Sequence, residues 1–546
     1  MKIFDHGKSM ILIKSFAYLI FCILLSLISA NLQVKAGGKT PYFKVFKGKW
    51  SEIENTYSKE LIALAKTIKP NKEIAALMIM RVKECAHEEG ALSEFKEGFP
   101  EPSEDSLSAE ARWFEATLWP DMINEKKAGL VCAGKDMKEF DKIKKPSEDA
   151  LKSLAKKLEK LNKTTASDFY KLAGEAFKRR EIGRAYQAIR NVLKYDANHG
   201  KTRKALGCRQ YKKAWLQQYD IIQLKRKLIW TDKWGWVGKK TKSQLEKGKY
   251  PLKGKLLSRE AYLNALKSSW SNAITVETEH FTIESNAGLE DVVKAGQLAE
   301  RHYKNYFALF SELLIDKSKG ISTGFIPPSK KKFPIKYYVD QESFRKLAQK
   351  YFSQQIANEG GFFSYTEQLS CIWKDESHNN WYWNIIHECT HQIIDFHKKY
   401  NENNLKTSNA WACEALPSFM EDIIVRDDGS YSVLKDPRRM SSAKNMRRDK
   451  TLIPFPVLVK MNNKELLARC GREVAQYGYN ITYGQLSAII HFFMSYNEGE
   501  YRQRFMGFLK KAYYETVTPD SLEKHIGVKL EILDEQFSDW LGKLDI

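Results

Sequence analysis

The sequence contains no pair of cysteines at C-x-x-C spacing, although it has eight cysteines among its 546 residues. It therefore carries neither zinc-ribbon ligands nor a thioredoxin-like redox motif. One cysteine, Cys22, lies in an N-terminal apolar segment. The seven that remain are an odd number, so at least one thiol stays free or pairs between chains, and their spacing leaves any disulfide connectivity open.

Long hydrophobic runs are also missing, apart from Ser15–Ala30 near the N-terminus. That run is shorter than the roughly 20 apolar residues of a membrane-spanning helix. Three lysines precede it, and Val34-Lys35-Ala36 then supplies small residues before Gly37. This layout predicts a signal peptide over residues 1–36 and an exported protein, whether periplasmic, cell-surface or secreted. An uncleaved signal that anchors the chain in a membrane is the alternative.

The composition is that of a folded and strongly basic protein. Hydrophobic residues make up 43% and charged residues 29%, with a formal net charge of +22. Residues 1–36 hold four Lys and one Asp, a net charge of +3, so the rest of the chain keeps 22 − 3 = +19. Such a charge attracts anionic partners such as cell-wall polymers or lipid head groups, or is simply a solvated lysine-rich surface. No specific nucleic-acid binding is expected.

Apolar residues at three- and four-residue spacing predict a helical N-terminal region over residues 37–165. Residues 166–207 look like one tetratricopeptide-type helix–turn–helix within a second region, 166–270. The rest of that region is a basic linker rich in tryptophan. Its aromatic residues, interleaved with Lys, could stack bases or sugars, but a small local core is the expectation.

The third region, residues 271–546, places strand patterns first and helices later, which indicates an α+β domain. Alternating apolar residues predict a strand over 276–283, a second over 335–339 and a third over 362–373. Helices are expected between them, over 289–313 and 342–352.

The clearest chemical signal is His387-Glu388-Cys389-Thr390-His391, within a helical stretch. Four residues along a helix bring His391 to within about 40° of His387, one turn further on. Both imidazoles can therefore reach one tetrahedral zinc ion. Glu388 lies beside that position and is the candidate general base and acid.

Two residues compete as the third zinc ligand. His397 has the spacing of a metzincin ligand, but that pattern needs a glycine for a sharp turn, and Ile394 stands at the corresponding position. A continuing helix would carry His397 away from the metal, so His397 is interpreted as a helix-end residue. Glu414, 23 residues after His391, is favoured because a loop and a second helix can return it to the site.

The HECTHQ and WACEALPSFME segments together resemble the gluzincin metallopeptidases, in particular the peptidase-MA-like group. The resemblance covers about residues 275–546. It implies a zincin-like fold and Zn²⁺ held by His387, His391 and Glu414, with Glu388 as base. Ala415 stands where the family often has glycine, and Pro417 is unusual but acceptable in the first turn of the second helix.

Further residues follow from the same comparison. Gly361–Tyr365 with Leu369–Trp373 resembles the strand that borders the cleft of these enzymes. Tyr483, in Tyr483-Gly484-Gln485, resembles a family tyrosine near the site and could donate a hydrogen bond to the oxyanion, with Tyr479 as the alternative.

Four other residues near the motifs are candidates for supporting roles. Glu421 or Asp422 could orient a ligating histidine. Cys389 and Cys413 are expected to face away from the metal, in packing or a mutual disulfide.

The sequence thus predicts an exported zinc metallopeptidase that hydrolyses peptide bonds of peptides or proteins through a zinc-activated water. The alternative is a non-catalytic binding protein on a zincin scaffold that recognises cell-surface or wall partners through its basic helical half. The intact HExxH motif with Glu414 favours the enzyme.

Overall fold

The computed structural model describes residues 42–68, 71–85, 107–143, 145–314, 331–348, 360–374, 381–426, 431–434, 437–477 and 480–544. The predicted signal peptide, residues 1–36, lies outside them. Contacts divide the chain into Met1–Gly48 and Lys49–Ile546, and all the sheets formed by the described residues lie in the second unit. Its structure is mixed α and β, mostly helical with small sheets, so the α+β class is confirmed.

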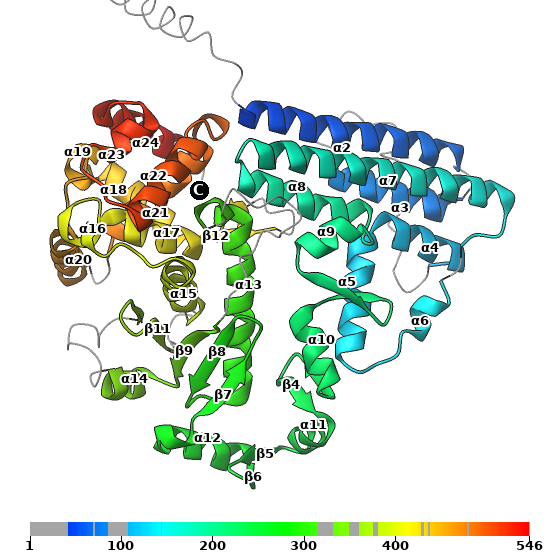
Figure 1. Cartoon of the computed structure of the whole chain (residues 1–546), viewed down its shortest axis with the longest axis horizontal. Helices are drawn as coiled ribbons and strands as arrows, with labels where there is room; N and C mark the ends of the chain where they lie inside the picture. The colour runs from blue at the N-terminus through cyan, green and yellow to red at the C-terminus, as the bar shows by residue number, and fades with distance from the viewer. Residues whose placement is uncertain are drawn as a thin grey trace, which may run out of the picture. The chain divides into compact units, whose positions relative to one another are not determined.

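The first part of the chain is helical, as its apolar spacing predicts. The helices are α2 (Tyr42–Thr67), α3 (Lys72–Cys85), α4 (Ala109–Leu118), α5 (Pro120–Cys132), α6 (Lys138–Asp141), α7 (Asp149–Lys178), α8 (Ile182–Tyr195) and α9 (Gly200–Ala205). Helices α7 and α8 run side by side (Figure 1). Each buries an apolar face, as expected. The predicted helix–turn–helix is present, but its first helix begins at Asp149 rather than near residue 166. No helix in the described ranges combines the length and apolar character needed to cross a bilayer.

Three consecutive β-hairpin–helix units follow, in a region that was expected to be a linker. They begin at Cys208, Leu228 and Lys249, at intervals of 20 and 21 residues. Their elements are β1 (Cys208–Tyr211), β2 (Ala214–Gln217) and α10 (Gln218–Lys225); β3 (Leu228–Thr231), β4 (Gly235–Gly238) and α11 (Lys239–Glu246); and β5 (Lys249–Leu252), β6 (Lys255–Ser258) and α12 (Arg259–Ser268). Their apolar residues form small local clusters, as expected for this region.

A five-stranded sheet forms the centre of the following region. Its strands are β7 (Ile274–Glu277), β8 (Phe281–Ser285), β9 (Phe333–Tyr338), β10 (Gly361–Ser364) and β11 (Leu369–Trp373), in the spatial order β10-β11-β9-β8-β7. Strands β8, β9 and β11 are parallel, and the outer pairs β7–β8 and β10–β11 are antiparallel. Strand β10 is therefore an edge strand of this sheet.

Two of the strand predictions are wrong in detail because a hairpin replaces a single strand. Residues 276–283 are divided between β7 and β8. Thr278 closes that turn, since its backbone N–H donates to the carbonyl of Phe281 and its hydroxyl accepts from the N–H of Phe281. Residues 362–373 are likewise divided between β10 and β11. The remaining predicted strand, residues 335–339, corresponds to β9.

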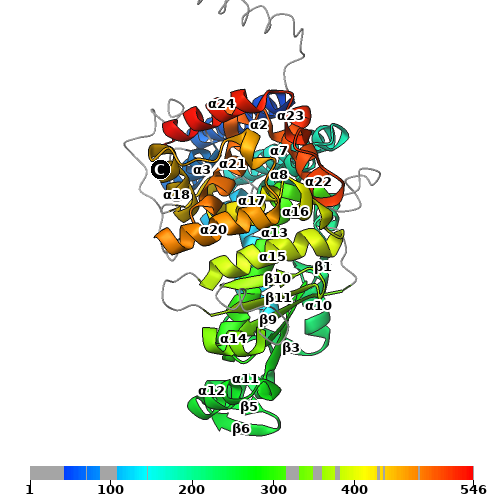
Figure 2. The same cartoon turned by 90° about the vertical axis from the view of Figure 1, so that its left-hand side faces the viewer.

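Helices cover the sheet and complete the core. Helix α13 (Leu289–Leu314) packs on β7 and β8, α14 (Gln341–Ala348) on β9 and β11, and α15 (Trp381–His397) on β10 and β11 (Figure 2). The other elements are α16 (Asn403–Thr407), α17 (Trp411–Glu421), β12 (Ile423–Val425), β13 (Tyr431–Val433), α18 (Arg438–Arg448), α19 (Phe455–Leu458), α20 (Asn463–Tyr477), α21 (Thr482–Ser495), α22 (Arg502–Tyr514), α23 (Ser521–Ile526) and α24 (Leu530–Lys543). Helices α13, α15, α17, α21 and α22 contribute to one large hydrophobic cluster.

Candidate metal centre

Helix α15 presents two histidines from successive turns. Ile385, Ile393 and Ile394 are buried on its other sides and fix the helix in the core. This packing leaves His387 and His391 on a common face, with their Nε2 atoms 3.3 Å apart. The helical spacing of the HExxH segment therefore does bring both imidazoles together.

Helix α17 brings Glu414 to the same point. One carboxylate oxygen of Glu414 lies 3.2 Å from Nε2 of His387 and 3.5 Å from Nε2 of His391. Tetrahedral zinc with ligand bonds of about 2.0–2.2 Å would separate its ligand atoms by about 3.3–3.6 Å. The three atoms therefore have the mutual distances of a tetrahedral site, and they form one of two clusters with metal-ligand atoms within 4.8 Å of one another in the described residues.

The pKa values of His387 and Glu414 are shifted because the imidazoles and carboxylates of the site stabilise one another's charged forms. Burial disfavours a charged imidazole, but hydrogen bonds to Glu414 and Glu421 outweigh it and raise the pKa of His387 to about 9. For Glu414, burial alone would raise the pKa of its carboxyl, yet the two histidines hold that pKa well below its usual range. An ionised carboxylate between two imidazoles is a suitable environment for a divalent cation.

Glu421 lies behind His387, on the last turn of α17. Its Oε1 accepts a hydrogen bond of 2.7 Å from Nδ1 of His387. Burial of Glu421 is outweighed by Arg439 and His387, which lower the pKa of its carboxyl to about 2. Because Nδ1 of His387 donates to an ionised carboxylate, a metal ion that displaces the Nε2 proton would meet the Nε2 lone pair in a fixed orientation. The structure therefore favours Glu421 over Asp422, whose carboxylate accepts instead from the backbone N–H of Met440.

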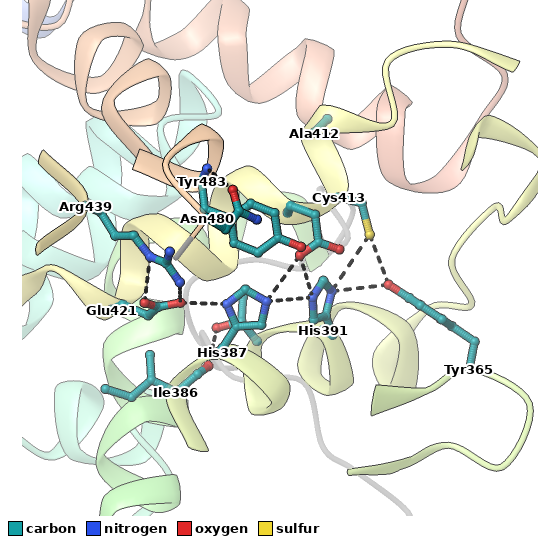
Figure 3. Close-up of polar contacts among 12 residues, drawn as sticks. Tyr365, Ile386, His387, His391, Ala412, Cys413, Glu421, Arg439, Asn480 and Tyr483 are labelled. Carbon is teal, nitrogen blue, oxygen red and sulfur yellow. Dashed lines mark hydrogen bonds and ion pairs between the residues drawn. The ribbon is translucent and has the colours of Figure 1, made fainter. Parts of the chain in front are cut away.

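Tyr365 lies behind His391 as Glu421 lies behind His387, and this contact was not predicted from the sequence. Its hydroxyl lies 3.2 Å from Nδ1 of His391 and 3.1 Å from Sγ of Cys413. In Figure 3, Arg439, Glu421, His387, His391 and Tyr365 follow one another in a row. The only signal in the sequence was that Tyr365 ends the segment that resembles the cleft-bordering strand.

Glu388, the candidate base, lies between α15 and the edge strand β10. It is buried, and a side chain at Gly361 of β10 would place its Cβ only 3.2 Å from Cγ of Glu388. A glycine at position 361 therefore lets the strand approach the carboxylate side chain closely. The hydroxyl of Ser370 on β11 also donates to the backbone carbonyl of Glu388.

Tyr483 lies in the first turn of α21, beside the histidine pair. Its ring is parallel to that of His387, with the centroids 6.0 Å apart and 4° between the planes (Figure 3). Its backbone N–H donates to the side chain of Asn480 at 3.4 Å. The alternative donor, Tyr479, lies outside the described residues.

Other expectations are corrected or completed by the contacts. His397 ends α15 as expected, and its Nε2 lies 2.9 Å from the Tyr303 hydroxyl. Pro417 lies in the interior of α17 rather than in its first turn. Cys389 and Cys413 are free and buried, so no mutual disulfide is present. Sγ of Cys413 lies 3.8 Å from Nδ1 of His391, behind the ring and away from the Nε2 atom that faces the metal position.

A second cluster joins Glu279, His280 and Glu300. There the two oxygens of Glu300 lie 2.6 Å from the backbone nitrogen and 2.8 Å from Nδ1 of His280. These are hydrogen-bond lengths rather than the separations of tetrahedral metal ligands. We interpret this cluster as a histidine–carboxylate pair.

No protein-family model and no curated protein sequence matches this chain significantly.

Proposed function

We propose that the chain is a zinc-dependent peptidase of the gluzincin type. The observation that carries the proposal is the set of three distances among His387, His391 and Glu414, 3.2, 3.3 and 3.5 Å, which fit the edges of a zinc tetrahedron. Two histidines and one carboxylate leave the fourth position for water or substrate, which is the ligand number of hydrolytic rather than structural zinc sites. When bound, zinc would lower the pKa of a coordinated water and polarise the substrate carbonyl.

The proposal assigns roles to the residues around the ligands. Glu388 accepts a proton from the attacking water and returns it to the leaving amine. Tyr483 donates a hydrogen bond to the developing oxyanion, and Glu421 and Tyr365 fix the orientation of the two imidazoles. An extended peptide pairs with the edge strand β10, which adjoins Glu388 through Gly361.

We also propose that the enzyme is exported and that its basic helical half contacts anionic surface or wall polymers. The supporting observations are the apolar segment after Lys14 and the net charge of +22. N-terminal sequencing of the protein recovered outside the cytoplasm should begin near Gly37. A chain that retains residues 1–36 in the membrane fraction would favour the uncleaved anchor.

The test is the zinc content per chain of four purified proteins. Wild type, Glu388→Gln and His397→Ala should each hold one equivalent of zinc, and Glu414→Ala should lose it. Glu388→Gln should also reduce hydrolysis of a mixed peptide library about 10²–10⁴-fold, because it removes the general base without removing a ligand.

Each alternative has its own outcome. Wild type without zinc, or full zinc in Glu414→Ala, would contradict the metal site. Loss of zinc in His397→Ala would favour a metzincin arrangement. Zinc at one equivalent with no hydrolysis of any peptide in the library would favour the binding protein on a zincin scaffold.

A further inference from the structure

The end of α17 and the beginning of α18 meet through a forked ion pair behind the candidate metal centre. Arg439 donates from Nε to one oxygen of Glu421 at 2.9 Å and from a terminal nitrogen to the other oxygen at 3.0 Å. The second of these oxygens is the one that accepts from His387. Both side chains of the ion pair are buried, with 12% of Arg439 and 3% of Glu421 exposed.

The same guanidinium also lies over the ring of Tyr483. Its central carbon is 5.2 Å from the ring centroid, and that ring is in turn parallel to His387. The backbone enforces the contact, because a Cβ at Gly484 would lie only 2.6 Å from the carbonyl oxygen of Arg439. Figure 3 shows Arg439, Glu421, His387 and Tyr483 together on one side of the site.

We infer that Arg439 is a positioning residue that orients both the carboxylate behind one metal ligand and the tyrosine that faces the reaction. This inference rests on the proposed function. Through Glu421 it keeps Nε2 of His387 directed at the metal, and through the face of Tyr483 it holds the phenol beside that ligand. One side chain therefore couples metal affinity to the hydrogen bond that Tyr483 donates.

An arginine is required for this double contact. Its planar guanidinium offers a rigid fork to a carboxylate and a flat face to an aromatic ring at the same time. A lysine keeps the positive charge, so Glu421 is not left uncompensated, but its single ammonium cannot make both contacts. Arg439→Lys therefore removes the geometry while it preserves the charge.

The matched control is Arg448→Lys, on the last turn of the same helix. Arg448 also donates from two nitrogens to a carboxylate, at 2.9 and 3.3 Å to the two oxygens of Asp449, but 71% of its side chain is exposed. It lies nine residues beyond Arg439, and none of its contacts involves a residue of the metal centre. The two variants thus make the same Arg→Lys change on one helix, at a residue that contacts the candidate centre and at one that does not.

The first experiment measures zinc affinity by competition with a chelator and the d–d absorption of the cobalt-substituted protein. Arg439→Lys should weaken zinc binding about 10–100-fold, the usual effect of losing a group behind a ligand, and should shift the cobalt spectrum. Arg448→Lys should leave both unchanged. A spectrum of Arg439→Lys identical to wild type, with the same zinc affinity, overturns the inference.

The second experiment separates the Tyr483 contact from general damage through a double-mutant cycle. Arg439→Lys and Tyr483→Phe should each lower kcat more than they raise KM, and the double variant should lose less than the product of the two single losses. Multiplicative losses would contradict a role exerted through Tyr483. Wild type that binds zinc but hydrolyses nothing contradicts the proposed function alone, since zinc affinity and the cobalt spectrum still test Arg439; wild type without zinc overturns both.

Discussion

At the scale of single residues, the candidate centre consists of ligands that the sequence could indicate and supporting groups that it could not. The spacing of His387, Glu388 and His391 fixes their relation on any helix. The contact of Tyr365 with His391 depends instead on where a hairpin 26 residues earlier meets α15. No local sequence pattern predicts that contact. The resemblance to a family segment therefore included Tyr365 but did not assign it a role.

Removal of the Tyr365 hydroxyl should weaken zinc binding. In Tyr365→Phe, Nδ1 of His391 loses its oxygen neighbour at 3.2 Å, and we expect zinc affinity to fall about 10-fold or more in a chelator competition. Tyr303→Phe is the control, because it removes a phenol 2.9 Å from His397 at the other end of the same helix, where no ligand lies. Equal zinc affinities in the two variants would show that Tyr365 does not orient His391.

A second residue-scale prediction concerns the stability of the fold in acid. Burial lowers the pKa of His491 to about 3, whereas an unfolded histidine titrates near 6.5. The unfolded chain therefore binds this proton first, so the contribution of His491 is intact above pH 6.5 and is lost as the pH falls towards 3. Between pH 7 and pH 5 this residue should cost the wild type about 2 kcal/mol of unfolding free energy.

Urea unfolding of wild type and His491→Gln at both pH values measures that cost. Other titrating groups are common to the two proteins, so they cancel in the comparison. The variant should lose about 2 kcal/mol less than wild type on going from pH 7 to pH 5. Parallel losses would mean that His491 is solvated or protonated in the folded protein.

At the scale of elements, helices were more predictable than hairpins. The apolar periodicity of α13 and α15 extends over several turns and marks both helices in the sequence. The first hairpin–helix unit turns through Lys212 and Lys213, both with positive φ, where glycine or asparagine would be the usual signal. The second and third units do turn at a glycine with positive φ, Gly235 and Gly254, but the three turns do not share one length or residue pattern, so no fixed motif marks the repeat.

The contact between α18 and α21 should depend on Gly484. A Cβ there would lie 2.6 Å from the Arg439 carbonyl oxygen and 3.0 Å from the backbone nitrogen of Ala443, and backbone atoms cannot move aside cheaply. We expect Gly484→Ala to destabilise the protein by about 1–3 kcal/mol, despite the better helix propensity of alanine. Gly471 in α20 has no atom within 4 Å of its Cβ position, so Gly471→Ala should stabilise by about 0.5–1 kcal/mol. Thermal melting should give shifts of opposite sign, and shifts of the same sign would contradict the close helix contact.

At the scale of the whole molecule, buried charges tie the helical hairpin to the helices around the candidate centre. Arg502 of α22 donates to Glu312 of α13 at 2.8 Å and lies 3.5 Å from Glu181 at the start of α8. Glu312 also accepts from the backbone N–H of Gly183 at 2.9 Å. These partners are 190 and 321 positions from Arg502 in the sequence, so no spacing argument could pair them. They help to explain why residues 49–546 form one compact unit although the sequence suggested separate regions.

Loss of Arg502 should therefore destabilise both halves of that unit together. Arg502→Met leaves Glu312 buried without its cation, whereas Glu181 keeps Arg184 at 3.2 Å. Loss of one partner of a buried ion pair typically costs about 3–5 kcal/mol, and urea unfolding should remain a single transition at lower urea. Adding Glu312→Gln to Arg502→Met removes the uncompensated charge and should recover much of the loss. Lys171→Ala, which removes an exposed ion pair with Asp168, should change the stability by less than about 0.5 kcal/mol. Arg502→Met could instead unfold in two steps, with zinc released at the same urea concentration as in wild type. That outcome would show that the helical hairpin folds independently of the helices around the candidate centre, and that the buried charges only connect two separately stable parts.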